Sequence, residues 1–162
     1  MEIKLVEEII KNYNLKKLEE EGVYVDKIYC SPFSYKEDVG VGSSMIGLYS
    51  PYVNSKSCFH KLTNDELWHF YGGDPLELYL LYEDGKTENI ILGSDFRKGH
   101  RTTYVVKANT WQGGCTYSGG VYSLFGCTVF PEFTIDCFTA GEVDYLVNKY
   151  PEMKDVILKL TI

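Results

Sequence analysis

The sequence predicts an all-β domain whose short strands are joined by tight turns. Three observations favour this class over a helical bundle: the aromatic fraction is 15% with 14 tyrosines, glycine occurs 15 times, and β-branched residues are frequent. Aromatic and β-branched side chains suit the half-buried surface of a sheet, while glycine permits the turns. At 162 residues, the chain is expected to form one domain, 1–162, that needs no metal or disulfide to fold.

The N-terminal part combines a helix with the first strand. Apolar residues recur at three- and four-residue spacing between Ile3 and Leu18, which predicts an amphipathic helix that ends near Asn14. Residues 22–29 contain tyrosine and β-branched residues in partial alternation and are expected to form a strand. The polar, glycine-containing stretch 31–44 is predicted to be a mobile surface loop of the kind that can act as a lid.

Strand patterns follow one another through the middle of the chain. Residues 57–62 and 66–71 are expected to pair as a hairpin through a turn at 63–65. Eight or more strands at short, regular spacing without intervening helices predict a sandwich or barrel. Besides that hairpin, the expected strands are 45–49, 76–82, 87–92, 102–107, 120–125 and 127–130, and short helices are expected at 140–149 and 152–160.

Composition excludes several classes of partner. The net charge is −7 and no basic run occurs, which argues against nucleic acid or an anionic membrane. The five cysteines include no C-x-x-C pair and are expected to be reduced thiols. The N-terminus lacks the pattern of a signal peptide and no apolar run is long enough to span a bilayer, so we expect a cytoplasmic protein.

The stretch 59–75 is where we expect a site, because it concentrates titratable and aromatic side chains in a short apolar segment. The predicted turn brings Glu66 back beside His60, an arrangement suited to a general base with a tuning carboxylate. The alternative is a hydrogen-bonded core histidine and a turn carboxylate. Strict alternation places Trp68 on the face of Glu66 and His69 on the opposite face, where it would belong to the outer surface.

Other chemistries have little support in the sequence. There is no G-x-S-x-G elbow for a serine nucleophile, and neither common glycine-rich phosphate-binding motif is present. Without basic neighbours, the many tyrosines and tryptophans are typical of a sheet core rather than of a platform for RNA bases. His100 lies in a polar turn and is expected to be exposed to solvent.

Several ordered phrases resemble the cupins, in particular the small single-domain subfamily known as domain of unknown function 985, which includes relatives of a yeast cupin-like protein. The resemblance covers nearly the whole chain and implies a double-stranded β-helix, or jelly roll, that usually forms a homodimer. The phrases are Glu21-Gly22-x-Tyr24, His60-Lys61-Leu62, Asp65-Glu66-Leu67-Trp68-His69, Gly73-Asp74-Pro75-Leu76, Val105-Val106-x-Ala108-x-Thr110-Trp111-Gln112, Gly126-Cys127-Thr128-Val129-x-Pro131-x-Phe133 and Tyr150-Pro151.

The resemblance also shows a departure from the usual cupin metal site. His60 and Glu66 occupy two of the metal-binding positions, but Leu62 and Gln112 stand where the pattern has histidines. Catalytic zinc and non-haem iron normally take three or more strong ligands, so no cofactor is expected. The alternative is a divalent metal held by His60, Glu66 and an unexpected third ligand, His69.

We therefore expect a barrel that binds a small sugar-like or carboxylated metabolite. His60 and Glu66 would be catalytic and Gln112 would hold a substrate oxygen, while aromatic walls would come from Trp68, Trp111 and Tyr49. The function that we test first is a metal-free isomerase or epimerase, with His60 as base, Glu66 orienting it and a tyrosine as acid. The alternatives are a metal-dependent cupin enzyme and a non-catalytic ligand-binding or sensing barrel.

Overall fold

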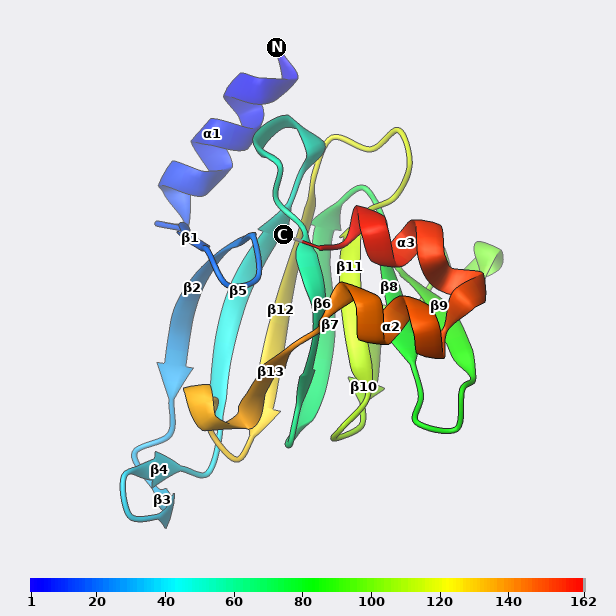
Figure 1. Ribbon diagram of the computed structural model, residues 1–162. Helices are drawn as coiled ribbons and strands as arrows, with labels where there is room; N and C mark the ends of the chain where they lie inside the picture. Colours follow the sequence, from blue (N-terminus) through cyan, green and yellow to red (C-terminus); the bar gives the residue numbers. More distant parts are fainter. Residues whose placement is uncertain (162) are drawn as a thin grey trace.

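The computed structural model describes residues 1–161 and contains two antiparallel β-sheets packed face to face (Figure 1). One sheet has the strand order β1-β2-β5-β12-β7-β10, and the other has the order β13-β6-β11-β8-β9. In both sheets most neighbouring strands are distant in the sequence, as expected of a jelly roll. The predicted all-β class is therefore confirmed.

The N-terminal half begins with α1, which ends two residues before Asn14, where the backbone adopts a left-handed conformation with φ +53°. The predicted helix and first strand are confirmed, and β1 between them was not predicted. The elements are α1 (Glu2–Asn12), β1 (Lys16–Leu18), β2 (Val23–Cys30), β3 (Ser34–Lys36), β4 (Val39–Gly40), β5 (Ser43–Tyr49), β6 (Ser57–Leu62) and β7 (Asp65–Gly73).

The C-terminal half differs from the prediction at three places. The predicted strands 120–125 and 127–130 correspond to one continuous strand, β12, and the strands β11 (residues 111–116) and β13 (residues 138–140) were not predicted. The elements are β8 (Leu76–Leu81), β9 (Thr87–Leu92), β10 (Thr103–Val106), β11 (Trp111–Thr116), β12 (Ser123–Phe130), β13 (Phe138–Ala140), α2 (Val143–Lys149) and α3 (Lys154–Lys159).

Glycine in β11 reflects close packing rather than a turn. A Cβ atom on Gly113 would lie 3.2 Å from the ring of Phe59, and one on Gly114 would lie 3.0 Å from the hydroxyl of Tyr49. The strand therefore needs residues without side chains where aromatic rings cross it. This requirement explains why a run that resembles a turn in the sequence forms part of the sheet.

The core of the barrel lies between the two sheets. It combines Tyr49, Trp68 and Phe125 from one sheet with leucines from β8 in the other. The rings of Trp68 and Phe125 are stacked with centroids 5.0 Å apart, and those of Tyr49 and Phe125 are 4.4 Å apart. Burial of these rings and leucines supplies the main stabilisation of the fold.

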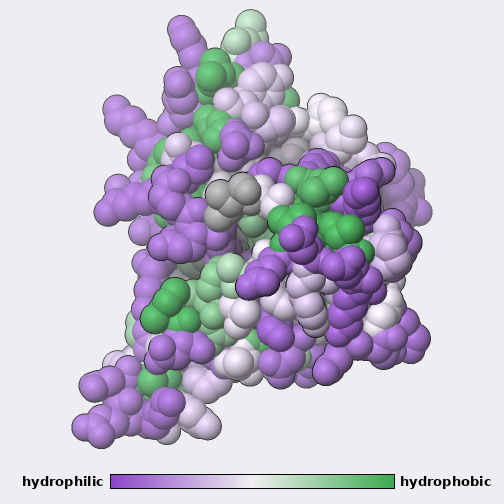
Figure 2. All heavy atoms as spheres, in the orientation of Figure 1, coloured by the Kyte–Doolittle hydropathy of each residue, from purple (hydrophilic) through white to green (hydrophobic). Residues whose placement is uncertain are grey.

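The helices pack on the outside of the sheets. Leu146 of α2 and Ile157 of α3 are fully buried in a second cluster with Phe59, Leu81 and Trp111, so both helices cover the outer face of the five-stranded sheet (Figure 1). The face turned to the viewer in Figure 2 is mainly hydrophilic, with a hydrophobic group over the C-terminal helices. No described helix is long and apolar enough to cross a membrane.

The connection between β6 and β7 is not the predicted hairpin. β6 pairs with β11 and β13, whereas β7 pairs with β10 and β12 in the other sheet. The turn after Leu62 carries the chain from one sheet to the other, since each strand finds a partner far away in the sequence. His60 and Glu66 consequently approach the interior from opposite sheets.

The segment 31–44 is only partly a loop. It contains the small hairpin of β3 and β4, and its last residues, Ser43 and Ser44, belong to β5. Glu132 ties this hairpin to the barrel, because its carboxylate accepts the Gly40 N–H at 2.9 Å and the Lys27 ammonium at 2.6 Å. Hydrogen bonds from the Cys30 thiol, Lys27 and Gly40 lower the pKa of Glu132 to about 2.

All five cysteines are free thiols. Four of them are buried as expected, while Cys30 is exposed. No disulfide joins them, and the reduced state expected from their spacing stays a prediction.

Candidate functional site

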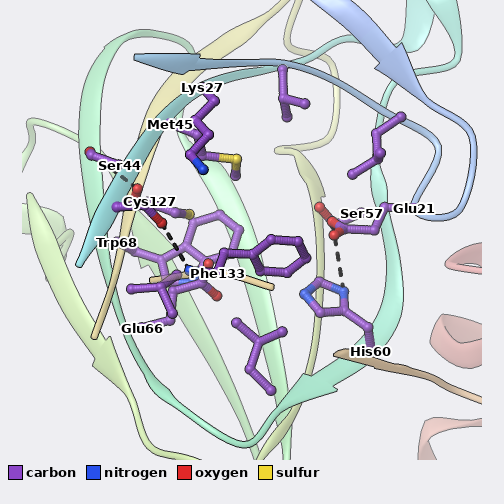
Figure 3. Close-up of a pocket in the computed structure, with 15 residues that line it drawn as sticks. Glu21, Lys27, Ser44, Met45, Ser57, His60, Glu66, Trp68, Cys127 and Phe133 are labelled. Atoms are coloured by element: carbon purple, nitrogen blue, oxygen red, sulfur yellow. Dashed lines mark hydrogen bonds and ion pairs between the residues drawn. The ribbon is translucent and has the colours of Figure 1, made fainter. Parts of the chain in front are cut away.

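A cavity with a volume of about 140 Å³ lies inside the barrel and is lined by residues of both sheets (Figure 3). Its walls are mainly apolar, with a few polar groups that converge on the space. The apolar lining comprises Leu18, Val25, Met45, Leu62, Trp68, Cys127, Val129 and Phe133, and the polar lining comprises Glu21, Lys27, Ser43, Ser44, Ser57, His60 and Glu66.

His60 projects into this cavity from β6 and is 4% exposed. Its Nδ1 lies 2.9 Å from the carbonyl oxygen of Cys58. Because a carbonyl oxygen only accepts hydrogen bonds, Nδ1 must carry the proton. In the neutral ring, Nε2 then keeps a free lone pair. The ring is held flat against Phe138, with centroids 5.3 Å apart.

Glu21 is the carboxylate paired with His60, a role that sequence reasoning assigned to Glu66. Its Oε2 lies 3.9 Å from His60 Nδ1, and its side chain is buried (Figure 3). The backbone fixes this position, since the Glu21 carbonyl accepts the Cys58 N–H at 2.9 Å and Gly22 follows with φ +78°. The phrase Glu21-Gly22 carried the family resemblance and was the available signal for this residue.

Glu66 enters the cavity from β7, in the other sheet. Its Oε2 accepts a hydrogen bond of 2.6 Å from the side-chain amide of Gln112. Burial raises the pKa of Glu66 and the Glu21 carboxylate adds to that rise, while His60 and the Gln112 hydrogen bond oppose it. The result is a carboxyl group that holds its proton more tightly than an exposed glutamate.

Gln112 supports Glu66 and does not line the cavity, which corrects the predicted role of holding a substrate oxygen. It is 1% exposed, and its Oε1 accepts the indole N–H of Trp68 at 3.0 Å while its Nε2 binds Glu66. Both ends of the amide are therefore occupied by protein groups. Trp68 itself lines the cavity as predicted.

Trp111 and Tyr49 are not cavity walls, which corrects two further predictions. Trp111 precedes Gln112 in β11, and adjacent residues of a strand point to opposite faces, so its ring packs outside the barrel against Tyr145 of α2. Tyr49 is fully buried in the core, where its hydroxyl donates to Ser57 Oγ at 2.7 Å. Tyr49 therefore positions a cavity residue without reaching the cavity.

His69 lies on the outer face of β7, as the alternation predicted. Its Nε2 is 3.3 Å from the hydroxyl of Thr128, and its ring is stacked on Tyr71. The alternative metal site of His60, Glu66 and His69 does not converge, because only the first two line the cavity. Among the described residues, no group of three or more histidine, cysteine or acidic side chains is arranged to hold a metal.

The second histidine position of the cupin metal pattern, two residues after His60, contributes no ligand either. Leu62 lines the cavity with an aliphatic side chain, and the Gln112 amide is already bound on both sides. The donor set of residues 1–161 thus does not fit the zinc or iron site of metal-dependent cupins.

Replacing Glu66 by glutamine tests the protonation of this carboxyl. A raised folded-state pKa means that the folded protein binds the proton more tightly than the unfolded chain does. The contribution of this proton to the free energy of unfolding is therefore fully present below about pH 4.5 and is lost as the pH rises through the folded pKa. We expect the stability of Glu66→Gln relative to wild type to rise over that window by about 1.4 kcal/mol per unit of pKa elevation. Urea unfolding across a pH series measures the difference, and a pH-independent difference contradicts the prediction.

The comparisons with known proteins agree with this architecture. Residues 7–141 match the family described as "Cupin superfamily (DUF985)". Protein SO0799 from Shewanella oneidensis is 30% identical, with a TM-score of 0.88 over 96% of each chain. A hypothetical protein from Leishmania major is 24% identical, with a TM-score of 0.86 over 96% of this chain and 97% of that chain.

More distant structures share the fold alone. A double-stranded β-helix protein from Klebsiella pneumoniae is 13% identical, with a TM-score of 0.50 over 82% of this chain and 94% of that chain. No curated protein matches the sequence. Structural similarity at this level of identity supports the double-stranded β-helix fold alone.

Proposed function

This chain belongs to the DUF985 family of the cupin superfamily, and we propose that its barrel binds a small polar metabolite. In this proposal the protein is a metal-free isomerase or epimerase that moves a proton on the bound metabolite. The observation that carries the proposal is the state of His60. Its Nδ1 proton is directed to a carbonyl oxygen, which leaves the Nε2 lone pair as a base in a buried, largely apolar cavity.

The surrounding groups suit proton transfer at a carbon next to a carbonyl. When His60 takes the proton, the Glu21 carboxylate beside Nδ1 stabilises the imidazolium that forms. No tyrosine is among the described residues that line the cavity, so Glu66 takes the place of the proposed tyrosine acid. Burial raises its pKa, so it takes up a proton more readily than an exposed glutamate and can pass that proton to the substrate oxygen. Gln112 acts as a positioning residue for Glu66.

The size of the cavity limits what it holds. Its volume of about 140 Å³ is close to that of a protein cavity that accommodates one benzene molecule, about 150 Å³. We therefore propose a ligand, or the reacting part of a longer one, about as large as a single six-membered ring. The Ser57 hydroxyl accepts a hydrogen bond from Tyr49 and the Ser43 hydroxyl accepts one from the Phe133 N–H, so each keeps its own proton to donate to a hydroxyl or carboxylate group of the ligand.

The experiment is a thermal-shift screen of small sugars, hydroxy acids and oxo acids, followed by NMR analysis of each stabilising compound in D₂O. Deuterium incorporation next to the carbonyl, or conversion to an isomer, is the expected result, since an exchangeable His60 proton returns to the substrate carbon. His60→Ala should lower the rate by about 10² to 10⁴, and His69→Ala, on the outer face, should leave it unchanged. An unchanged rate in His60→Ala removes the mechanism.

The same experiment separates the alternatives. Stabilisation by a compound without exchange or conversion supports a non-catalytic binding or sensing barrel, because binding raises stability whether or not turnover follows. Turnover that appears only after adding a divalent metal, and that depends on His60 and Glu66, supports a metal-dependent enzyme in place of the metal-free one.

A further inference from the structure

A second cleft lies outside the barrel, between α2 and the outer face of the five-stranded sheet. Its volume is about 260 Å³, compared with about 140 Å³ for the barrel cavity, and the two share no lining residue. One lining residue is in β6, one begins β11, two are in connecting turns and two are one helical turn apart on α2. They are Lys61, Trp111, Glu83, Asn109, Tyr145 and Lys149.

Two ammonium groups face this cleft without a carboxylate partner. The Lys61 ammonium lies 4.7 Å from the centroid of the Trp111 ring, and that of Lys149 lies 3.5 Å from the hydroxyl of Tyr145. Within residues 1–161 neither forms an ion pair, in contrast to Lys27, Lys86, Lys98 and Lys107.

Most lysines in the described part of the chain are unpaired in this way, so the distinguishing feature of Lys61 and Lys149 is that both line one cleft, in a chain of net charge −7. Each ammonium offers three hydrogen-bond donors, and aromatic rings occupy only one side of it. The remaining donors are free to bind the oxygens of a phosphate or carboxylate group, for which lysine is a common partner. The charge of the cleft therefore favours an anionic group.

The other lining residues suit a polyol next to that anion. The rings of Trp111 and Tyr145 are 6.2 Å apart and inclined at 54°. Tyr145 is 47% exposed and Trp111 only 6%, so Tyr145 is the accessible wall and Trp111 supports it from below. The Glu83 carboxylate accepts hydroxyl protons, and the Asn109 amide both donates and accepts. Glu83 also reduces the positive charge of the cleft, so it disfavours ligands with more than one phosphate group.

We propose that this cleft is a second binding site, for a sugar phosphate. Lys61 and Lys149 hold the phosphate, the Tyr145 ring packs on the apolar face of the sugar, and Glu83 and Asn109 bind its hydroxyl groups. The site is separate from the barrel cavity and does not depend on the reaction proposed there.

The two tryptophans make the proposal directly measurable, because Trp111 lines the cleft and Trp68 lines the barrel. We would titrate glucose 6-phosphate, inorganic phosphate and glucose into ¹⁵N-labelled protein and follow both indole N–H signals. Glucose 6-phosphate is expected to shift the Trp111 signal and leave that of Trp68 unchanged. Inorganic phosphate should give a weaker effect on Trp111, and glucose the weakest.

Substitutions assign the contacts. The double variant Lys61→Met, Lys149→Met should bind glucose 6-phosphate at least about tenfold more weakly, which is the loss expected for removing charged hydrogen bonds. Tyr145→Ala should weaken glucose 6-phosphate but not inorganic phosphate. The control Lys86→Met, at a lysine paired with Asp84 outside the cleft, should bind like wild type. In each variant an unchanged Trp68 signal reports an intact barrel.

Three outcomes would overturn the proposal. The first is no shift of Trp111 at millimolar glucose 6-phosphate. The second is an undiminished affinity in the double lysine variant, which would show that the cleft ammoniums do not hold the ligand. The third is a shift of Trp68 in place of Trp111, which would show that the compound binds in the barrel.

Discussion

Phe125→Ala is expected to lower the free energy of unfolding by about 3–5 kcal/mol, the loss typical of a fully buried phenylalanine. Phe125 is 0% exposed, and its ring contacts those of Tyr49 and Trp68 at centroid distances of 4.4 and 5.0 Å. The Phe125 ring also lies directly against the backbone of Gly47, where an added Cβ atom would come within 2.5 Å of it. Neighbouring strands cannot collapse into the void without moving these groups.

Equilibrium unfolding in urea measures this effect, and Phe96→Ala is the matched control. Phe96 is 76% exposed, so its truncation should change stability by no more than about 0.5 kcal/mol. Equal losses in the two variants, or a loss under about 1 kcal/mol at Phe125, would show that the stacked rings are not the centre of the core.

Gln112→Met is expected to destabilise the protein by about 3 kcal/mol at neutral pH. Methionine keeps most of the volume, so the loss comes from polar groups. The variant leaves the buried Glu66 carboxyl without its 2.6 Å donor and the Trp68 N–H without its acceptor. A buried charged group that loses its partner costs more than the hydrogen bond contributed.

The pH dependence of that loss identifies its source. At a pH below the raised pKa of Glu66 the carboxyl is neutral and needs the amide less, so the destabilisation by Gln112→Met should shrink as the pH falls. In the double variant Glu66→Gln, Gln112→Met this pH dependence should disappear. Urea unfolding at two pH values provides the measurement, and a loss that is the same at both places the cause in packing instead.

Local patterns in the sequence were sufficient for most elements of the fold. The three- and four-residue spacing before Asn14 predicted α1, and alternation in 66–71 placed Glu66 and Trp68 inside and His69 outside. The hairpin of β6 and β7 was wrong because a short polar turn is equally compatible with a crossover between sheets. Only pairing with distant strands, β11 for β6 and β12 for β7, distinguishes these two arrangements.

The candidate site was predicted in part. His60, Glu66 and Trp68 do line one cavity, whereas Gln112 is enclosed behind Glu66, and Trp111 and Tyr49 lie outside the space. Gln112 and Trp111 are adjacent in a strand and so could not share a face. Glu21 was missed as the partner of His60 because the two residues are far apart in sequence and meet only when β6 folds beside the segment that precedes β2.

The sequence by itself determined the all-β class, the family resemblance and the presence of a histidine and a glutamate in the interior, because these depend on residue type, spacing and strand period. The tertiary structure alone decided which groups they contact. In the folded chain His60 is paired with Glu21, Glu66 accepts a hydrogen bond from Gln112, and Lys61 and Lys149 line the second cleft beside α2. The physical reason is that hydrogen bonds and burial are set by strand pairing between distant segments, and a local pattern in one chain does not specify that pairing.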